Sequence, residues 1–345
     1  MGNGTPVTTK STFLAAQAYS DVLALRGFPF DSGNVYYVDE TNGADTNSGL
    51  DGWSNAKATI QAAITAASQH DTILIAPVEI TAGDTDPGSY SENLVIAPAQ
   101  AFLTLLGVPR GRTQGGLPQL KVGATTTQAL LTIRAPGCTI RNLGFNGAGA
   151  TGGGIILDEA TATGQAWGTA IENCHFKNCV GTTATNAATG GAIMWSASGG
   201  AWQVLIKGNR FYKNVGDIVM KGTSSSVPQD VVIEDNVFSG PAASVDCNIY
   251  VASDGINGLI IRNNCFTALP AIGSGTNAQF LALNGCIGIL ADNTFAASTA
   301  EGGSEETFGA TGNNIVPTTV FMARNYGEFS TGVGAGLVSG EIFRT

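Results

Sequence analysis

A seven-residue phrase recurs along this chain of 345 residues, and the recurrence narrows the range of folds more than the composition does. Six copies occupy residues 139–145, 170–176, 205–211, 232–238, 260–266 and 289–295. Each copy ends in phenylalanine, with steps of 31, 35, 27, 28 and 29 residues between Phe145, Phe176, Phe211, Phe238, Phe266 and Phe295. A unit of about 30 residues that repeats in tandem is typical of a solenoid, in which each coil packs on its neighbours.

The positions within the phrase predict a strand, a turn and a buried ring. The second position is apolar and is expected to point inward from a short strand: Ile140, Ile171, Ile206, Ile233, Ile261 and Leu290. The fifth position is Leu143, Cys174, Asn209, Asn236, Asn264 and Asn293. Asparagine tolerates the left-handed backbone of a tight turn and bonds to stacked equivalents, so we expect a ladder of asparagines there. A weaker copy at 321–327 puts Tyr326 near the phenylalanine position.

The third position of the phrase alternates in charge along the chain. It is Arg141, Glu172, Lys207, Glu234 and Arg262 in the first five copies and Ala291 in the sixth. In parallel, in-register stacking, equivalent residues lie about 4.8 Å apart, where opposite charges attract and like charges repel. The alternation therefore favours side-by-side stacking with a defined register, although exposed ion pairs stabilise by only about 0–1 kcal/mol each.

A second set of short apolar segments follows the phrase, at residues 154–158, 192–196, 217–221, 248–252 and 280–284. Each coil therefore has at least two short strands, and no helix intervenes between them. Glycine is abundant, with 47 residues, as expected where turns recur closely and strands stack tightly. We expect an all-β chain that forms a single-stranded parallel β-helix of about eight coils.

The segment before the repeats carries a family resemblance. Residues 34–77, NVYYVDETNGADTNSGLDGWSNAKATIQAAITAASQHDTILIAP, read as a strand, a turn, a helix and a first coil. With the repeats, the chain resembles the pectin-lyase-like right-handed parallel β-helix superfamily, and is closest in character to bacteriophage spike and decoration proteins. The resemblance implies a right-handed β-helix over 34–327 with an N-terminal capping helix at about 57–68. Its apolar stripe is expected to close the solenoid end: Ala58, Ile60, Ala63, Ile64 and Ala67.

The two ends of the chain lie outside the repeats. Residues 1–33 are predicted to form an attachment or assembly segment, and residues 328–345 a C-terminal tail or cap. The first segment has the apolar spacing of a short amphipathic helix at Phe13, Leu14, Ala18, Val22 and Leu25. Since such an appendage resembles the attachment segment of phage spikes, which are usually trimers, we expect a homotrimer that contacts other virion proteins.

Charge and cysteine content limit the partners and the compartment. The formal net charge of −10 argues against a nucleic-acid partner, and no apolar run is long enough to insert in a membrane. The first ten residues lack the charged and apolar regions of a secretory signal. We therefore expect synthesis in a host cytoplasm and location in a virion, with a secreted protein as the alternative. The cysteines lack zinc-ligand spacing and are interpreted as buried free thiols: Cys138, Cys174, Cys179, Cys247, Cys265 and Cys286.

One segment has the alternating oxygen ligands of a cation loop. The sequence DTNSGLD at 45–51 lacks the glycine at the sixth position and the glutamate at the twelfth position that a calcium loop has. We interpret it as a turn, so no metal site and no cofactor is predicted, and calcium is the one alternative.

Candidate catalytic residues are few. Asp217 and Asp246 precede the second strand of neighbouring coils, and Lys221 lies nearby in the sequence. Paired carboxylates and a base are the groups that polysaccharide hydrolases and lyases use, but we favour turn capping as the role of these acids. The two histidines, His70 and His175, are interpreted as surface residues, with His175 stacked near Arg210.

Several aromatic residues form a possible carbohydrate-binding platform, namely Trp195, Trp202, Tyr212 and Tyr250, together with Trp167. We favour the interpretation that they belong to the core or to a subunit interface, with the sugar platform as the alternative. Scaffold features are strong and reactive residues sparse, so we predict a non-catalytic structural virion protein, a capsid decoration or spike component. The first alternative is a polysaccharide lyase or hydrolase, such as a tailspike depolymerase or a pectate-lyase-like enzyme. The second is a carbohydrate-binding adhesin that recognises host surface polysaccharide.

Overall fold

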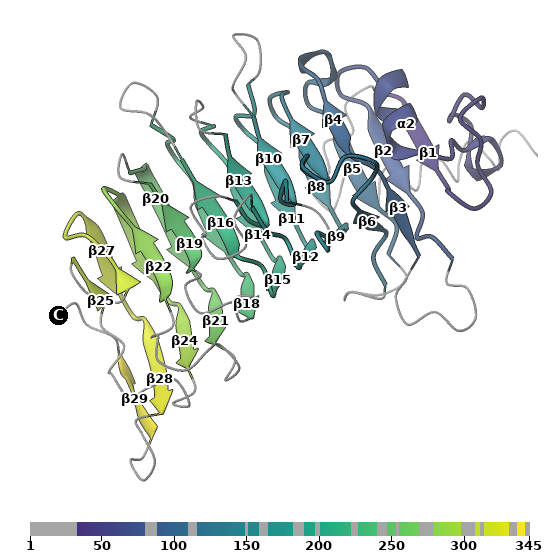
Figure 1. Cartoon of the computed structure of the whole chain (residues 1–345). Coiled ribbons are helices and arrows are strands. Elements are labelled where there is room, and N and C mark those ends of the chain that lie inside the picture. The colour runs from purple at the N-terminus through teal and green to yellow at the C-terminus, as the bar shows by residue number, and fades with distance from the viewer. Residues whose placement is uncertain are drawn as a thin grey trace, which may run out of the picture.

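The chain winds into one elongated solenoid of short strands (Figure 1). The computed structural model describes residues 33–79, 88–109, 116–148, 151–158, 165–181, 190–196, 201–221, 227–239, 247–252, 255–268, 279–297, 308–310, 314–330 and 337–341. The strands form three sheets, named here A, B and C, and each coil passes from A to B to C. This confirms the predicted right-handed parallel β-helix. No helix of these residues is both long and apolar enough to span a bilayer.

The bounds of the strands show how short each one is. In the described residues, sheet A contains β1 (Val35–Val38), β2 (Thr72–Ile75), β5 (Thr104–Gly107), β8 (Thr139–Arg141), β11 (Ala170–Glu172), β14 (Leu205–Lys207), β17 (Val232–Glu234), β20 (Asn257–Arg262), β23 (Ile287–Ala291) and β27 (Val320–Ala323). Sheet B contains β3 (Ser89–Ser91), β6 (Gln119–Lys121), β9 (Gly144–Asn146), β12 (His175–Lys177), β15 (Arg210–Tyr212), β18 (Val237–Ser239), β21 (Cys265–Ala268), β24 (Thr294–Ala297), β28 (Tyr326–Ser330) and β29 (Leu337–Glu341). Sheet C contains β4 (Leu94–Ile96), β7 (Leu131–Ile133), β10 (Ile155–Leu157), β13 (Ile193–Trp195), β16 (Gly216–Met220), β19 (Cys247–Val251), β22 (Gln279–Leu283), β26 (Asn314–Ile315) and β25 (Phe308–Gly309).

Neighbouring strands pair in parallel, except that β29 pairs antiparallel with β28 at the C-terminal end of sheet B. Sheet A has ten strands in the described part of the chain, two more than the eight predicted coils. The additional strands are β1 and β5. The β5 strand was not predicted, because its apolar residues are followed by Gly107 and not by the asparagine turn and phenylalanine of the phrase.

Each seven-residue phrase spans two strands and the bend between them. The bend comes from a left-handed residue at the fourth position, with φ between 49° and 68°: Asn142, Asn173, Gly208, Asp235, Asn263, Asp292 and Arg324. The prediction that the fifth-position asparagines supply the left-handed backbone was therefore wrong by one residue. The fourth residue turns the chain from sheet A to sheet B, and the fifth side chain then points into the core, where Asn209 is fully buried.

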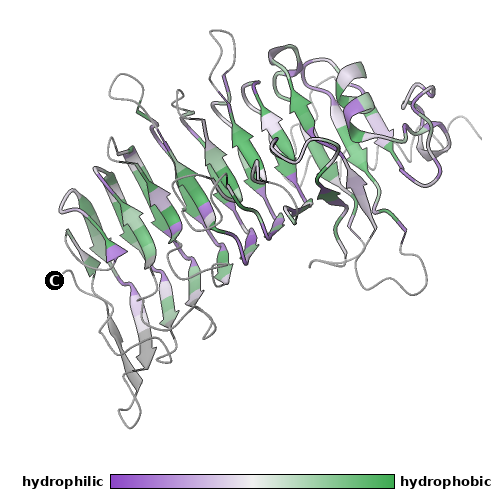
Figure 2. Cartoon of the chain, viewed as in Figure 1, coloured by the Kyte–Doolittle hydropathy of each residue, from purple (hydrophilic) through white to green (hydrophobic). Residues whose placement is uncertain are grey.

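The core is continuous along the solenoid, and hydrophobic residues are concentrated in the strands (Figure 2). The predicted inward residues at the second position are buried, and so are the six phenylalanines. Successive phenylalanine rings stack with centroids 4.6–5.1 Å apart and planes within 6–9°. In the seventh copy, the strand register aligns Gly327, not Tyr326, with Phe295. Tyr326 points outward and is 51% exposed, which corrects the prediction that it lies near the phenylalanine position.

One short helix, α2 (Ile60–Ala66), lies at the N-terminal end of the solenoid (Figure 1). It is shorter than the predicted span of 57–68, but Ile60, Ala63 and Ile64 enter the core as expected. Thr59 caps the helix by accepting a hydrogen bond from the Ala62 amide at 3.2 Å. The single-turn 3-10 helices η1 (Trp53–Asn55) and η2 (Pro98–Gln100) lie in connecting segments.

Candidate functional site

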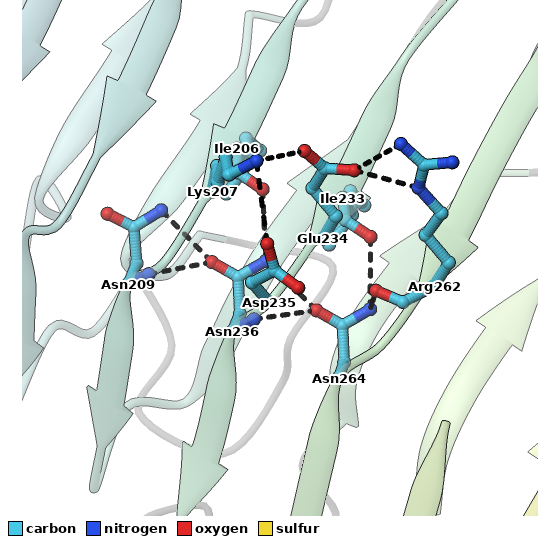
Figure 3. A network of polar contacts seen from close by, with 9 residues as sticks. All are labelled: Ile206, Lys207, Asn209, Ile233, Glu234, Asp235, Asn236, Arg262 and Asn264. Atoms are coloured by element: carbon cyan, nitrogen blue, oxygen red, sulfur yellow. Dashed lines mark hydrogen bonds and ion pairs between the residues drawn. The ribbon is translucent and has the colours of Figure 1, made fainter. Parts of the chain in front are cut away.

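The asparagine ladder is the most regular polar feature of the interior. The Oδ1 atom of Asn236 accepts from the backbone amide and the side-chain amide of Asn209, at 2.9 and 3.1 Å. Asn264 accepts in the same way from Asn236, at 3.0 Å for both bonds (Figure 3). The pattern continues through Asn293 to Asn325. Each side-chain amide also donates to a strand carbonyl of the preceding coil, as Asn236 does to Ile206. The ladder therefore satisfies buried polar groups in successive coils.

The charge column on the outer face of sheet A has the predicted register. Arg141, Glu172, Lys207, Glu234 and Arg262 pair in sequence across five strands. Glu234 contacts Lys207 and Arg262 at 2.6 Å each (Figure 3). Hydrogen bonds, first from Lys207 and then from Arg262, hold the pKa of Glu234 below its usual range. Glu234 therefore stays ionised and links three adjacent coils.

The candidate catalytic acid Asp217 lies inside the solenoid wall and not on an open surface. It is 3% exposed at the start of β16. Its carboxylate accepts from the Asn214 amide at 2.8 Å and from the Asn248 amide at 2.6 Å. Burial lowers the pKa of Lys221, which follows the same strand. Asp246 lies outside the described residues. Of the other two candidates, Lys221 is a half-buried base, and Asp217 links two neighbouring coils through its hydrogen bonds.

The predicted turn at residues 45–51 supports α2. Asp45 accepts from the backbone amides of Ala58 and Thr59, at 3.1 and 2.9 Å, and from the Thr59 hydroxyl. Lys57 donates its ammonium group to the carbonyls of Asp45 and Asn47. The carboxylate of Asp45 therefore binds the N-terminal end of helix α2. No group of three or more metal-ligating side chains occurs in the described ranges.

The histidines and cysteines are mostly enclosed. His175 is buried, contrary to the surface prediction, although it pairs with Arg210 in register as expected. Burial, with the nearby charges of Lys177 and Arg210, lowers the pKa of His175 to about 4. The six cysteines are free thiols, and five are buried, as predicted. Burial raises the pKa of Cys138, Cys174, Cys179 and Cys286 to about 12.

The predicted carbohydrate-binding residues do not form one platform. Trp195 is completely buried and donates its indole N–H to the Ala201 carbonyl, so it has no face to offer a sugar. Tyr212 lies on sheet B with the Lys213 ammonium 5.2 Å from its ring centroid. Tyr250 lies on sheet C against Cys247 and Ala282. Trp202 is 44% exposed in the turn before β14 and stacks with Trp167.

An apolar column on the outer face of sheet A was not predicted. Strand register aligns one outward residue from each of five coils, and these residues are named here the sheet A stripe: Leu205, Val232, Ile260, Ile289 and Phe321. The first three are half-buried, whereas Ile289 is 44% and Phe321 66% exposed. Ile287, in the same strand as Ile289, is 52% exposed. At this end the neighbouring charge column has become Ala291 and Ala323, so the outer face is apolar across its width.

The architecture defines the class of protein, a right-handed parallel β-helix. No protein-family model matches the chain, and no curated protein matches it. Among solved structures the chain is similar to Escherichia coli YbhC, at 12% identity, covering 87% of this chain and 86% of that chain with a TM-score of 0.50. It is also similar to the GH136 lacto-N-biosidase of Eubacterium ramulus, at 11% identity, 90% and 69% coverage and a TM-score of 0.41. A third similar structure is the tailspike protein of the E. coli bacteriophage HK620, at 13% identity, 90% and 60% coverage and a TM-score of 0.36. At these identities the similarity establishes the fold alone.

Proposed function

We propose that this chain is a structural protein of a virus particle, a spike or capsid decoration component, that works as a homotrimer and not as an enzyme. The observation that carries the proposal is the sheet A stripe. A rod whose interior is held by repeated ladders is stiff, and it leaves apolar side chains exposed on one face near its C-terminal end. Exposed apolar surface of this kind marks protein contact sites, and identical chains most often meet through symmetric contacts.

The exposed residues are large enough to contribute to association. Fully burying a side chain such as Ile or Phe stabilises by about 1.5–3 kcal/mol. Ile287, Ile289 and Phe321 are each 44–66% exposed, so about 1–2 kcal/mol per side chain remains to be gained on contact. A few such residues at the centre of an interface supply much of its binding energy, while polar residues surround them. The exposed ion pair of Asp292 and Arg324, which follows the alanines at this end, is suited to that surrounding role.

Light scattering on the full chain tests the assembly. We expect a mass of three chains of 35.1 kDa, and a monomer for Phe321→Asp. The matched control is Thr294→Asp, which places the same charge at an exposed position of sheet B and should leave the trimer intact. A single-chain mass for the unmodified protein at all concentrations would refute the homotrimer.

Two further measurements test the remaining parts of the proposal. Mass spectrometry of purified virus particles from the source should detect this chain, and its absence from every particle fraction would remove the virion assignment. Incubation with host surface polysaccharide and with acidic polymers, with and without calcium, should release no new reducing ends and no unsaturated products. Measurable turnover would favour the lyase or hydrolase instead.

A further inference from the structure

Asparagine followed by glycine is a pair in which the backbone is able to attack the side chain before it. The chain contains five such pairs, and four lie in the described residues: Asn42–Gly43, Asn146–Gly147, Asn257–Gly258 and Asn284–Gly285. Attack of the glycine nitrogen on the side-chain amide carbon closes a cyclic imide, and glycine has no Cβ atom to obstruct the approach. The fold decides at which pair the two groups are free to meet.

Hydrogen bonds restrain the asparagine side chain in three of the four pairs. Asn42 donates its side-chain amide to the Asp39 carboxylate at 3.1 Å. Asn146 is buried, and its side-chain oxygen accepts from the backbone amide two residues later at 3.2 Å. Asn284 donates to the Val251 carbonyl at 2.9 Å. Each bond has to break before the imide forms, which slows the reaction by about two- to tenfold.

Asn257 is the pair member whose side chain is not restrained. It begins β20, and both Asn257 and Gly258 are exposed. Its side chain makes no hydrogen bond within the part of the chain that the structure describes. Its backbone N–H donates to the Pro228 carbonyl at 3.2 Å, and its carbonyl accepts from the Asp230 amide at 2.9 Å. The backbone is therefore bonded to the preceding coil while the side chain extends into solvent.

Gly258 lies in a β-bulge. The pairing with β23 skips from Asn257 to Leu259, so Gly258 is the extra residue without a partner in that strand. Its φ is 75°, and a Cβ atom there would lie 2.6 Å from a carboxylate oxygen of Asp230. The backbone therefore requires glycine at this position, and the glycine stands outside the regular register of sheet A.

We propose that Asn257 is a site of spontaneous deamidation. The Gly258 nitrogen forms a bond to the Cγ atom of Asn257 and gives its proton to solvent, while the side-chain nitrogen takes up a proton and leaves as ammonia. Water then opens the imide at either of its two carbonyl groups, so residue 257 becomes aspartate or isoaspartate. In sum, water enters and ammonia leaves, and no oxidation or reduction takes place.

The new carboxylate changes the apolar end of sheet A. Asn257 pairs in register with Ile287, which is 52% exposed. Deamidation adds a negative charge to each chain, and a contact that covers Ile287 has to remove this charge from water, which is unfavourable. This consequence rests on the proposed homotrimer: deamidated chains should associate more weakly, and assembly should shield Asn257 from water.

Peptide mapping by mass spectrometry tests the site on the full chain after ageing in a mildly alkaline buffer. We expect aspartate and isoaspartate to accumulate at residue 257 about two- to tenfold faster than at Asn42, Asn146 or Asn284, which are controls within the same molecule. The presence of both products identifies the imide, because direct hydrolysis of the side chain gives aspartate alone. Asn257→Gln, whose longer side chain disfavours ring closure, should remove the products at this position only.

Light scattering of Asn257→Asp separates the modification from its effect on assembly. We expect this variant to require a concentration about tenfold higher than the unmodified protein to form trimers. The matched control Asn173→Asp makes the same change at an exposed asparagine between β11 and β12, and it should assemble normally. Circular dichroism of each variant checks that the β-helix is retained.

Two mapping results would overturn the proposal. The first is that isoaspartate does not form at residue 257. The second is that residue 257 reacts no faster than the slowest-restrained control among Asn42, Asn146 and Asn284. Trimers of Asn257→Asp that are as stable as those of Asn173→Asp would refute the effect on assembly. A single-chain mass for the unmodified protein would refute the homotrimer, and the mapping would still decide whether Asn257 is the reactive site.

Discussion

Replacing Asn264 by alanine removes the central member of the ladder. The Asn264 side chain is buried, accepts from the backbone and side-chain amides of Asn236, and donates to the carbonyl of Ile233. Asn264→Ala leaves the Asn236 backbone amide and the Ile233 carbonyl without these partners. Each buried polar group left unpaired costs about 1–3 kcal/mol, so we expect a loss of about 2–6 kcal/mol in the free energy of unfolding. Domains are stable by about 5–15 kcal/mol, which makes this a large effect.

Urea unfolding followed by circular dichroism measures the total loss, and hydrogen exchange of the Asn236 amide locates it. In a solenoid each coil contacts only its neighbours, so exchange should accelerate most in the coils on either side of the substitution. The control is Asn263→Gly at the adjacent residue, which is exposed and has φ of 55°, a value that glycine adopts freely. We expect this control to change stability by about 0.5 kcal/mol or less. Protection of the Asn236 amide in Asn264→Ala, with a loss below about 1 kcal/mol, would refute the account of the ladder.

Three further substitutions test other parts of the structure. Phe238 is fully buried between the rings of Phe211 and Phe266, with centroid distances of 4.8 and 4.6 Å. Phe238→Ala should therefore lower the free energy of unfolding in urea by about 3–5 kcal/mol. A loss no greater than that of Phe102→Ala, which removes a ring that is 40% exposed, would argue against the ring stack. The lowered pKa of Glu234 contributes stability that is present above the unfolded pKa and is lost as pH falls through the folded pKa. Glu234→Gln should therefore lower the free energy of unfolding at pH 7, and the two proteins should become equally stable in acid. A difference in stability that stays constant from pH 7 to pH 2 would contradict this. Asp217→Ala should lower the thermal midpoint because two buried amides lose their acceptor, whereas an unchanged midpoint with abolished polysaccharide turnover would make Asp217 catalytic.

Much of the fold could be predicted because, in a solenoid, residues at equivalent positions of successive repeats contact one another. Equivalent residues of successive coils become neighbours, so aligning the phrases also aligned the charge column and the phenylalanine stack. The identity of the left-handed residue could not be read in the same way. Asparagine occurs at both the fourth and the fifth positions, as in Asn263 and Asn264, and its tolerance of positive φ applies to both. The three-dimensional bend assigned the conformation to the fourth residue and the ladder to the fifth.

The surfaces depended on features that a one-dimensional repeat does not contain. Phe102 lies two residues before β5, and Trp202 lies three residues before β14. The loops before them differ in length, so aligning the repeats of the sequence does not show that these two rings occupy equivalent places in the fold. Trp195 and Trp202 are equally plausible surface residues by type, yet strand alternation turns Trp195 inward, while the turn leaves Trp202 exposed. The sequence alone determined which coils are neighbours, because their contacts recur at each level. Solvent exposure was decided by the folded chain, because it depends on the irregular segments between the strands.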